Sequence, residues 1–144
     1  MHQVMISSAA NADGSDLGLR AAYGPLFDKY GVDLVLCGHE HDYERSLTVR
    51  GVVSGTETLT PNPVSNATDV IESEHGTVHM VLGGGGVSGI TNKSFTTDDF
   101  DGHGHHSARV IMERVGKFNS VYATEAAVWI GVRDIEHPYG FASI

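Results

Sequence analysis

The sequence lacks several features that mark other protein classes. Its 144 residues include one cysteine, Cys37, so no disulfide can form within the chain, and this residue is expected to lie buried in the core. No apolar run approaches the ~20 residues that a membrane-spanning helix requires, so we expect no membrane partner. Met1 is followed directly by His2 and Gln3, without the basic and apolar regions of a signal peptide, and localisation stays unknown from the residues alone.

Basic residues are also scarce. Nine Lys and Arg residues stand against 18 Asp and Glu residues, which gives a net charge of −9 with neutral histidines. An acidic surface argues against a nucleic acid as partner, because nothing would neutralise its phosphates. A small phosphorylated substrate stays compatible, since bound metal ions reverse the local field. The hydrophobic content of 40% and the charged content of 19% are ordinary for a soluble globular domain.

The order of the expected elements indicates an α/β protein. A short strand end at residues 3–7 and a polar loop are followed by a helix that Asp16 caps and Gly31 ends. Pro25 predicts a kink or a division of this helix. The prediction of a helix is based on apolar residues at intervals of three and four, namely Leu19, Ala22, Tyr23, Leu26, Phe27 and Tyr30.

Strands account for most of the remaining predictions. Residues 32–37 form an apolar run too short for a helix, which fits a strand buried on both faces of an α/β sheet. We expect residues 43–53 to be extended and 54–74 to be a surface excursion. The further strands predicted from the pattern are 77–82, 108–115 and 120–124, with a second polar excursion at 88–107.

The strongest chemical signal is Gly38-His39-Glu40-His41, directly after the expected buried strand. In extended backbone, residues i and i+2 point the same way, so two imidazoles can converge on one metal ion or on two ions about 3.5–4 Å apart. Gly38 is expected to make the sharp turn out of the sheet and to allow close backbone approach. The C-terminal edge of an α/β sheet is where such sites occur.

These residues and their flanks resemble a known family. Residues 31–46 (GVDLVLCGHEHDYERS) closely resemble the purple acid phosphatase group of calcineurin-like metallophosphoesterases. Residues 1–8 (MHQVMISS) are similar to the family segment in which a ligand histidine ends a strand. Residues 76–86 are similar to a later strand that closes with glycines, and 128–141 to the end segment of bacterial secreted members. The resemblance implies an α/β fold, the C-terminal half of a sandwich of two sheets flanked by helices.

The resemblance also implies a metal site formed by three histidines. His2 and His39 would bind one metal ion and His41 the other. In the family the pair is iron with zinc, manganese or iron, and it activates a water that attacks phosphorus. A small phosphoric ester would be the substrate, and no further residue receives a catalytic role. Secretion is suggested by the family alone.

The chain departs from the family in its acidic ligands. The Asp-x-His, Gly-Asp-x-x-(Asp or Tyr) and Gly-Asn-His-(Asp or Glu) motifs do not precede His2. We therefore interpret residues 1–144 as a partial domain, truncated at both ends, with the missing N-terminal half as its partner. Three neutral imidazoles without a bridging carboxylate cannot neutralise two adjacent polyvalent cations, so weak binding of a single ion and little hydrolysis are expected.

Two alternatives stay open. One is a non-catalytic remnant of the same fold that binds a metal or a partner. The other is a cupin-like metal-binding module, although Glu44 follows His41 after only two residues where a cupin needs three or four. A metallo-β-lactamase motif fails, because Tyr43 and Glu44 stand where Asp and His are required.

Other polar residues receive simpler interpretations. The Asp101-Gly102-His103 match to Asp-x-His is attributed to chance, and the histidines and aspartates of residues 98–106 to a solvated loop. His79 is expected to be a core or edge histidine with its hydrogen bonds satisfied. Glu44 and Arg45 are expected to form an ion pair or to support the ligands. Trp129 and Tyr139 are expected to pack against a strand that follows the chain.

Overall fold

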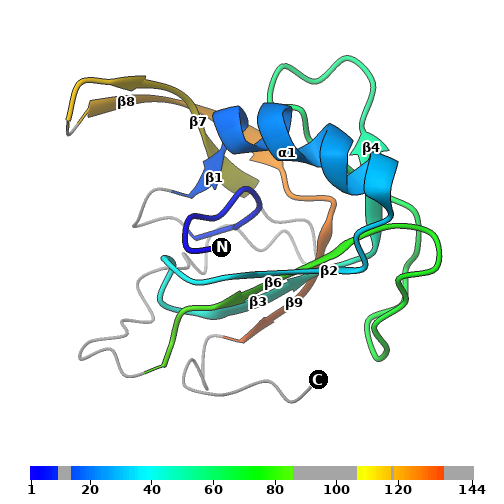
Figure 1. Ribbon diagram of the computed structural model, residues 1–144. Helices are drawn as coiled ribbons and strands as arrows, with labels where there is room; N and C mark the ends of the chain where they lie inside the picture. The colour runs from blue at the N-terminus through cyan, green and yellow to red at the C-terminus, as the bar shows by residue number, and fades with distance from the viewer. Residues whose placement is uncertain (10–13, 86–106, 118, 135–144) are drawn as a thin grey trace.

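The structure is a computed structural model that describes residues 1–9, 14–85, 107–117 and 119–134 (Figure 1). The expected mixture of helix and strands is confirmed within these ranges. The elements are α1 (Leu17–Tyr30), β1 (Ser15–Asp16), β2 (Leu34–Cys37), β3 (Tyr43–Ser46), β4 (Val49–Val52), β5 (Pro61–Pro63), β6 (Val78–Leu82), β7 (Ser107–Val115), β8 (Asn119–Ala126) and β9 (Ile130–Asp134). The loop histidines of residues 98–106 and Tyr139 lie outside the described residues. No helix in the described ranges has the length and apolar character needed to cross a membrane.

A four-stranded sheet of order β2-β6-β3-β9 forms the lower part of the molecule in Figure 1. β2 and β6 are parallel, with residues 34–37 opposite 78–81, and β3 is antiparallel to both β6 and β9. Parallel strands end at the same edge of a sheet, so the residues that follow β2 and β6 meet there. Residues 38–41 leave the sheet at this edge, as the sequence predicts.

The other strands form two smaller sheets. β7 and β8 make a long antiparallel hairpin with β1 parallel to β7, and this hairpin projects away from the four-stranded sheet (Figure 1). β4 and β5 pair with each other. The stretch 43–53 is extended as predicted, but it divides between two sheets at β3 and β4.

The ends of α1 follow the prediction. Asp16 accepts a hydrogen bond from the Leu19 N–H at 3.0 Å, and Gly31 ends the helix with φ of +61°. Pro25 lies inside the helix without dividing it. Its nitrogen carries no hydrogen, so the helical bond to Ala21 O is absent while the helix continues to Tyr30.

The apolar stripe of α1 is buried only in part. Leu19 and Phe27 pack on the core, whereas Tyr23, Leu26 and Tyr30 are exposed. Arg20 is the buried residue of the helix. Apolar spacing located the helix correctly, but the identity of its buried face depends on the polar partners that surround Arg20.

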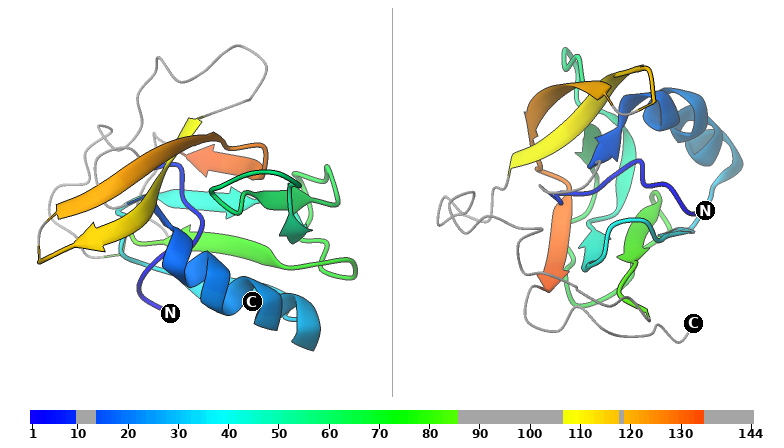
Figure 2. Two further views of the ribbon diagram at one scale, coloured as in Figure 1. Left: turned by 90° about the horizontal axis from the view of Figure 1, so that it is seen from above. Right: turned by 90° about the vertical axis from the view of Figure 1, so that its left-hand side faces the viewer.

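The prediction of a strand end at residues 3–7 is wrong. This segment is irregular and runs between α1 and the four-stranded sheet (Figure 2). Its side chains bury in two directions: Val4 packs with Val35, Cys37 and Val81, whereas Met5 and Ile6 pack with Ala108, Ala127 and Trp129. The segment thereby joins two parts of the core, and Cys37 is buried as expected. Backbone bonds from the Met1 amino group to Leu36 O and from Gly38 N to His2 O attach its start to β2.

Two further predictions need correction. Residues 54–74 are not simply a surface excursion, because they contribute β5 and bury Thr58, Thr60 and Pro61. Trp129 is 1% exposed and packs in the core with Met5 and Ile6, not against a following strand, and its indole N–H donates to Glu125 at 3.1 Å. Both residues are buried because they donate hydrogen bonds to the buried Glu125 carboxylate, Thr60 through its hydroxyl and Trp129 through its indole N–H.

Candidate metal centre

The structure brings His2 and His39 together. His39 Nδ1 lies 3.2 Å from His2 Nε2, and the rings stand edge to face with their centroids 5.1 Å apart. Two nitrogens that bind one ion at about 2.1 Å lie about 3.0–3.4 Å apart for octahedral to tetrahedral angles. The observed separation fits this range. In the structure the two nitrogens share a hydrogen bond at this distance, and one ion could take its place by accepting a lone pair from each ring.

A strained turn directs His39 toward His2. The φ angle of His39 is +63°, which is uncommon for a residue with a side chain. Glu40 N–H donates to Gly38 O at 2.8 Å and closes a three-residue turn centred on His39. Gly38 was expected to make the sharp turn, but the unusual angle belongs to His39. The backbone of His2 does approach Gly38, whose N–H donates to His2 O at 3.1 Å, but a Cβ on Gly38 would meet the His2 ring at an ordinary 3.5 Å, so this approach does not require glycine.

His41 lies on the exposed side of the same segment. Its ligand atoms do not join those of His2 and His39 in a group within 4.8 Å; among the described residues that criterion is met by Glu72, Glu74 and His75. One compact three-histidine site is therefore not formed. The assignment of His41 to a second ion stays a prediction.

Buried carboxyl groups fasten the two histidine-bearing segments together. Glu44, 2% exposed, accepts hydrogen bonds from Ser8 N–H at 2.9 and 3.0 Å and from Ser8 Oγ at 2.7 Å. Glu40, fully buried, accepts from Gly14 N–H at 2.9 Å. Arg45 does not pair with Glu44 and instead donates to Thr68 O. Of the two roles expected for Glu44, support of the site is the one its contacts provide.

Between these two acids lies Asp42, which is 1% exposed. Burial raises the pKa of Asp42 to about 9, and the charges of Glu44 and Glu40 act in the same direction while Arg133 opposes them. Burial also raises the pKa of Glu44 against the hydrogen bonds from Ser8. Neither oxygen of Asp42 has a hydrogen-bond partner in the part of the chain that the structure describes. A nearby cation would favour the ionised form of such groups.

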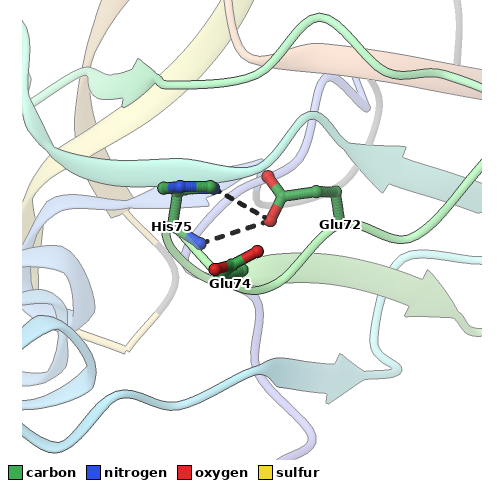
Figure 3. A group of neighbouring side chains, drawn as sticks. All are labelled: Glu72, Glu74 and His75. Carbon is green, nitrogen blue, oxygen red and sulfur yellow. Dashed lines mark hydrogen bonds and ion pairs between the residues drawn. The ribbon is translucent and has the colours of Figure 1, made fainter.

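A second group of possible ligands lies on the surface before β6 (Figure 3). The His75 ring nitrogen Nδ1 lies 3.2 Å from Glu72 Oε1, and the His75 N–H donates to the same oxygen at 3.3 Å. Glu74 projects toward this pair. Glu74 and His75 are exposed and Glu72 is half-buried, and the sequence did not indicate a role for any of the three. Their i, i+2, i+3 spacing in a polar loop is too common to have indicated a site.

Comparisons with known proteins give two kinds of match, and no protein-family model matches the chain. Uncharacterized proteins of Mycobacterium tuberculosis strains CDC 1551 and H37Rv are each 44% identical over 150 residues, which is 99% of this chain. The chain spans 27% of the length of these relatives. Purple acid phosphatase 1 of Ipomoea batatas is 37% identical over 70 residues, covering 49% of this chain and 13% of that protein. The chain is thus similar in part to a phosphatase.

Proposed function

We propose that this chain belongs to a metal-dependent phosphoric ester hydrolase and supplies histidine ligands to its metal centre. The observation that carries the proposal is the 3.2 Å separation of His2 Nε2 and His39 Nδ1, formed by residues 37 positions apart in the sequence. The partial similarity to a plant purple acid phosphatase supports the same chemistry. The finer fold assignment, half of a two-sheet sandwich flanked by helices, is part of this proposal.

The donor set indicates what the bound ions would do. Neutral imidazoles suit zinc and iron, and a bound ion lowers the pKa of its water toward about 7 while it neutralises phosphate charge. His2 and His39 would hold one ion, with His41 assigned to a second. Glu40 and Glu44 would keep the two segments in register through Gly14 and Ser8. The ligand bound there would be a small phosphoric ester, not a nucleic acid or a membrane lipid, and secretion remains part of the proposal.

Metal titration tests the ligand assignment. Calorimetric titration of the chain with Zn²⁺ and with Mn²⁺ should give weak binding that His2→Ala and His39→Ala each reduce by at least tenfold. Loss of one of two or three ligands removes a direct metal bond, which explains the expected size of the effect. His75→Ala removes a possible ligand of the separate group around Glu72, so it shows how much of the measured binding belongs to that group.

Orthophosphate binding tests the chemical class. The metal-loaded chain should bind orthophosphate, and the metal-free chain and the metal-treated His39→Ala variant should not. The proposal would be wrong if His75→Ala abolished metal binding while His2→Ala and His39→Ala left it intact. It would also be wrong if the metal-loaded chain bound orthophosphate no more tightly than the metal-free chain does.

A further inference from the structure

The surface turn directly before β6 presents three possible metal ligands, Glu72, Glu74 and His75 (Figure 3). One ligand atom from each lies within 4.8 Å of the other two. His75 Nδ1 lies 3.2 Å from Glu72 Oε1, which is inside the range of about 3.0–3.4 Å for two atoms that bind one ion at about 2.1 Å. Glu74 is exposed, so rotation about its side-chain bonds can supply a remaining approach of about 1–2 Å. The three side chains can therefore bind one ion together.

The backbone on both sides of these ligands is attached to Thr48 and Val49, at the start of β4. Thr48 Oγ1 donates a hydrogen bond to Glu72 O, and Thr77 and Val49 exchange two backbone hydrogen bonds of 2.9 Å. The His75 N–H also donates to Glu72 Oε1 at 3.3 Å, so this carboxylate keeps a donor when Nδ1 binds an ion instead. The ligands thus belong to a turn whose two ends are fixed, which lowers the entropic cost of binding.

The carboxylates of this turn have little positive charge beside them. In the described part of the chain, the ion pair of Glu72 is with His75, and no lysine or arginine forms one with Glu72 or Glu74. A neutral imidazole offers a lone pair and no charge, so two negative groups then face each other within 4.8 Å. A divalent cation would compensate both of them.

We propose that Glu72, Glu74 and His75 form a binding site for one divalent transition-metal ion, and that Zn²⁺ suits these donors best. One imidazole nitrogen and two carboxylate oxygens leave one position of a tetrahedral zinc ion for water. Calcium and magnesium prefer about six or more oxygen ligands and gain little from an imidazole, so the site should discriminate against them. The bound ion would hold the turn between its two anchors.

This site is separate from the candidate metal centre. The turn precedes β6, whereas the backbone of Glu40, next to His39, lies against Gly83, which follows β6. The two sites therefore lie at opposite ends of that strand. β6 has 5 residues, which at about 3.3 Å per residue span about 16 Å. The two sites share no ligand, and the proposal does not rest on the proposed phosphoric ester hydrolysis.

Titration of the ¹⁵N-labelled chain with Zn²⁺, followed by two-dimensional NMR, tests the proposal residue by residue. We expect saturable shifts at the amides of residues 72–76 and of Thr48, with half-saturation below about 1 mM. Ca²⁺ at the same concentrations should leave these amides unshifted. Binding at any other site is recorded at other amides, so it does not obscure the result.

Variants assign the ligands. His75→Ala should raise the half-saturating Zn²⁺ concentration at these amides by about tenfold or more, because it removes a direct bond to the ion. Glu74→Gln should raise it for the same reason. Glu57→Gln, at another exposed glutamate, is the matched control and should leave the titration unchanged. The double variant His2→Ala with His39→Ala should also leave it unchanged, because those residues belong to the other centre.

Several results would overturn the proposal. These are an absence of saturable shifts at residues 72–76, an unchanged titration in His75→Ala, or equal shifts with Ca²⁺, which would indicate attraction to the carboxylates without ligation by the imidazole. Loss of the shifts in the double variant of His2 and His39 would also overturn it, by assigning them to the other centre. Since the two sites are read at different amides, either proposal can fail while the other holds.

Discussion

Gly83 lies directly against the backbone of Glu40: a Cβ on Gly83 would stand 1.7 Å from the Glu40 carbonyl oxygen and 2.7 Å from its carbonyl carbon. Gly83 N–H also donates to Asp42 O at 3.3 Å. Gly83, directly after β6, and the histidine segment after β2 therefore meet at the shared edge of the parallel strands. The absence of a side chain at Gly83 is a condition for the observed position of the histidine turn.

We therefore expect Gly83→Ala to shift the turn that carries His39. Because the clash is with backbone, it cannot be relieved by a rotamer change, and the expected loss is about 2–3 kcal/mol in the free energy of unfolding. Urea denaturation measures this loss. Gly85→Ala is the control, since a Cβ there would meet nothing within 4 Å. Equal stability of the two variants would contradict the prediction.

The positive φ of His39 leads to a second prediction. His39→Gly should be more stable than His39→Ala by about 1 kcal/mol, because alanine keeps the strain of the left-handed conformation and glycine does not. His41 provides the comparison, since its φ is not positive. At His41 the order should reverse, with alanine above glycine. Urea denaturation of the glycine and alanine variants at both positions measures the two differences. The same order at both positions would show that the backbone of His39 is not strained.

Arg20 and Glu125 form a buried ion pair, with side chains 2% and 3% exposed. Burial would raise the pKa of Glu125, but the hydrogen bonds and charge of Arg20 and the bonds from Thr60 and Trp129 outweigh it, so the pKa is lowered. Glu125→Ala leaves a buried guanidinium uncompensated and should cost about 3–5 kcal/mol. Thermal and urea denaturation measure the loss.

The pair of Arg114, 45% exposed, and Asp16, 12% exposed, provides the control for the buried one. Arg114→Met should cost less than about 1 kcal/mol, because solvent screens the pair. The double variant Arg20→Met with Glu125→Gln should recover part of the loss seen for Glu125→Ala. If Arg114→Met lowered the free energy of unfolding as much as Glu125→Ala does, burial would not determine the cost of breaking an ion pair.

His79 should make stability depend on pH in a defined window. Its native pKa of about 3 lies below the ordinary value of 6.5, so between these values the unfolded state binds more protons. The contribution of neutral His79 is therefore complete above pH 6.5 and is lost as the pH falls toward 3. Urea denaturation from pH 4 to 7.5 should show the free-energy difference between wild type and His79→Phe growing with pH and then levelling. A flat difference for His79→Phe would contradict the prediction.

Local sequence signals located most elements of this protein. Asp16 and Gly31 bound the helix because capping and left-handed backbone are properties of single residues. The strand β2 and the following Gly-His-Glu-His segment were recognisable because strand length and apolar content are also local, but only one face of β2, with Val35 and Cys37, is buried, not both as predicted. The same block identified His39 as a candidate ligand, and the fold places His2 beside it.

Tertiary structure alone decided which polar residues were buried and what they contacted. Residues 3–7 look like a strand in sequence, yet they are irregular because Val4 and Met5 face different parts of the core. Arg20 is buried since Glu125, 105 positions later, neutralises it, and no local pattern encodes such a distant partner. The strained φ of His39 and the Nδ1 of His79, which among the described residues lacks the hydrogen-bond partner that was predicted, likewise arise from packing between separate elements. Sequence determined most of the elements and indicated the candidate ligands, whereas long-range contacts determined the geometry of the site.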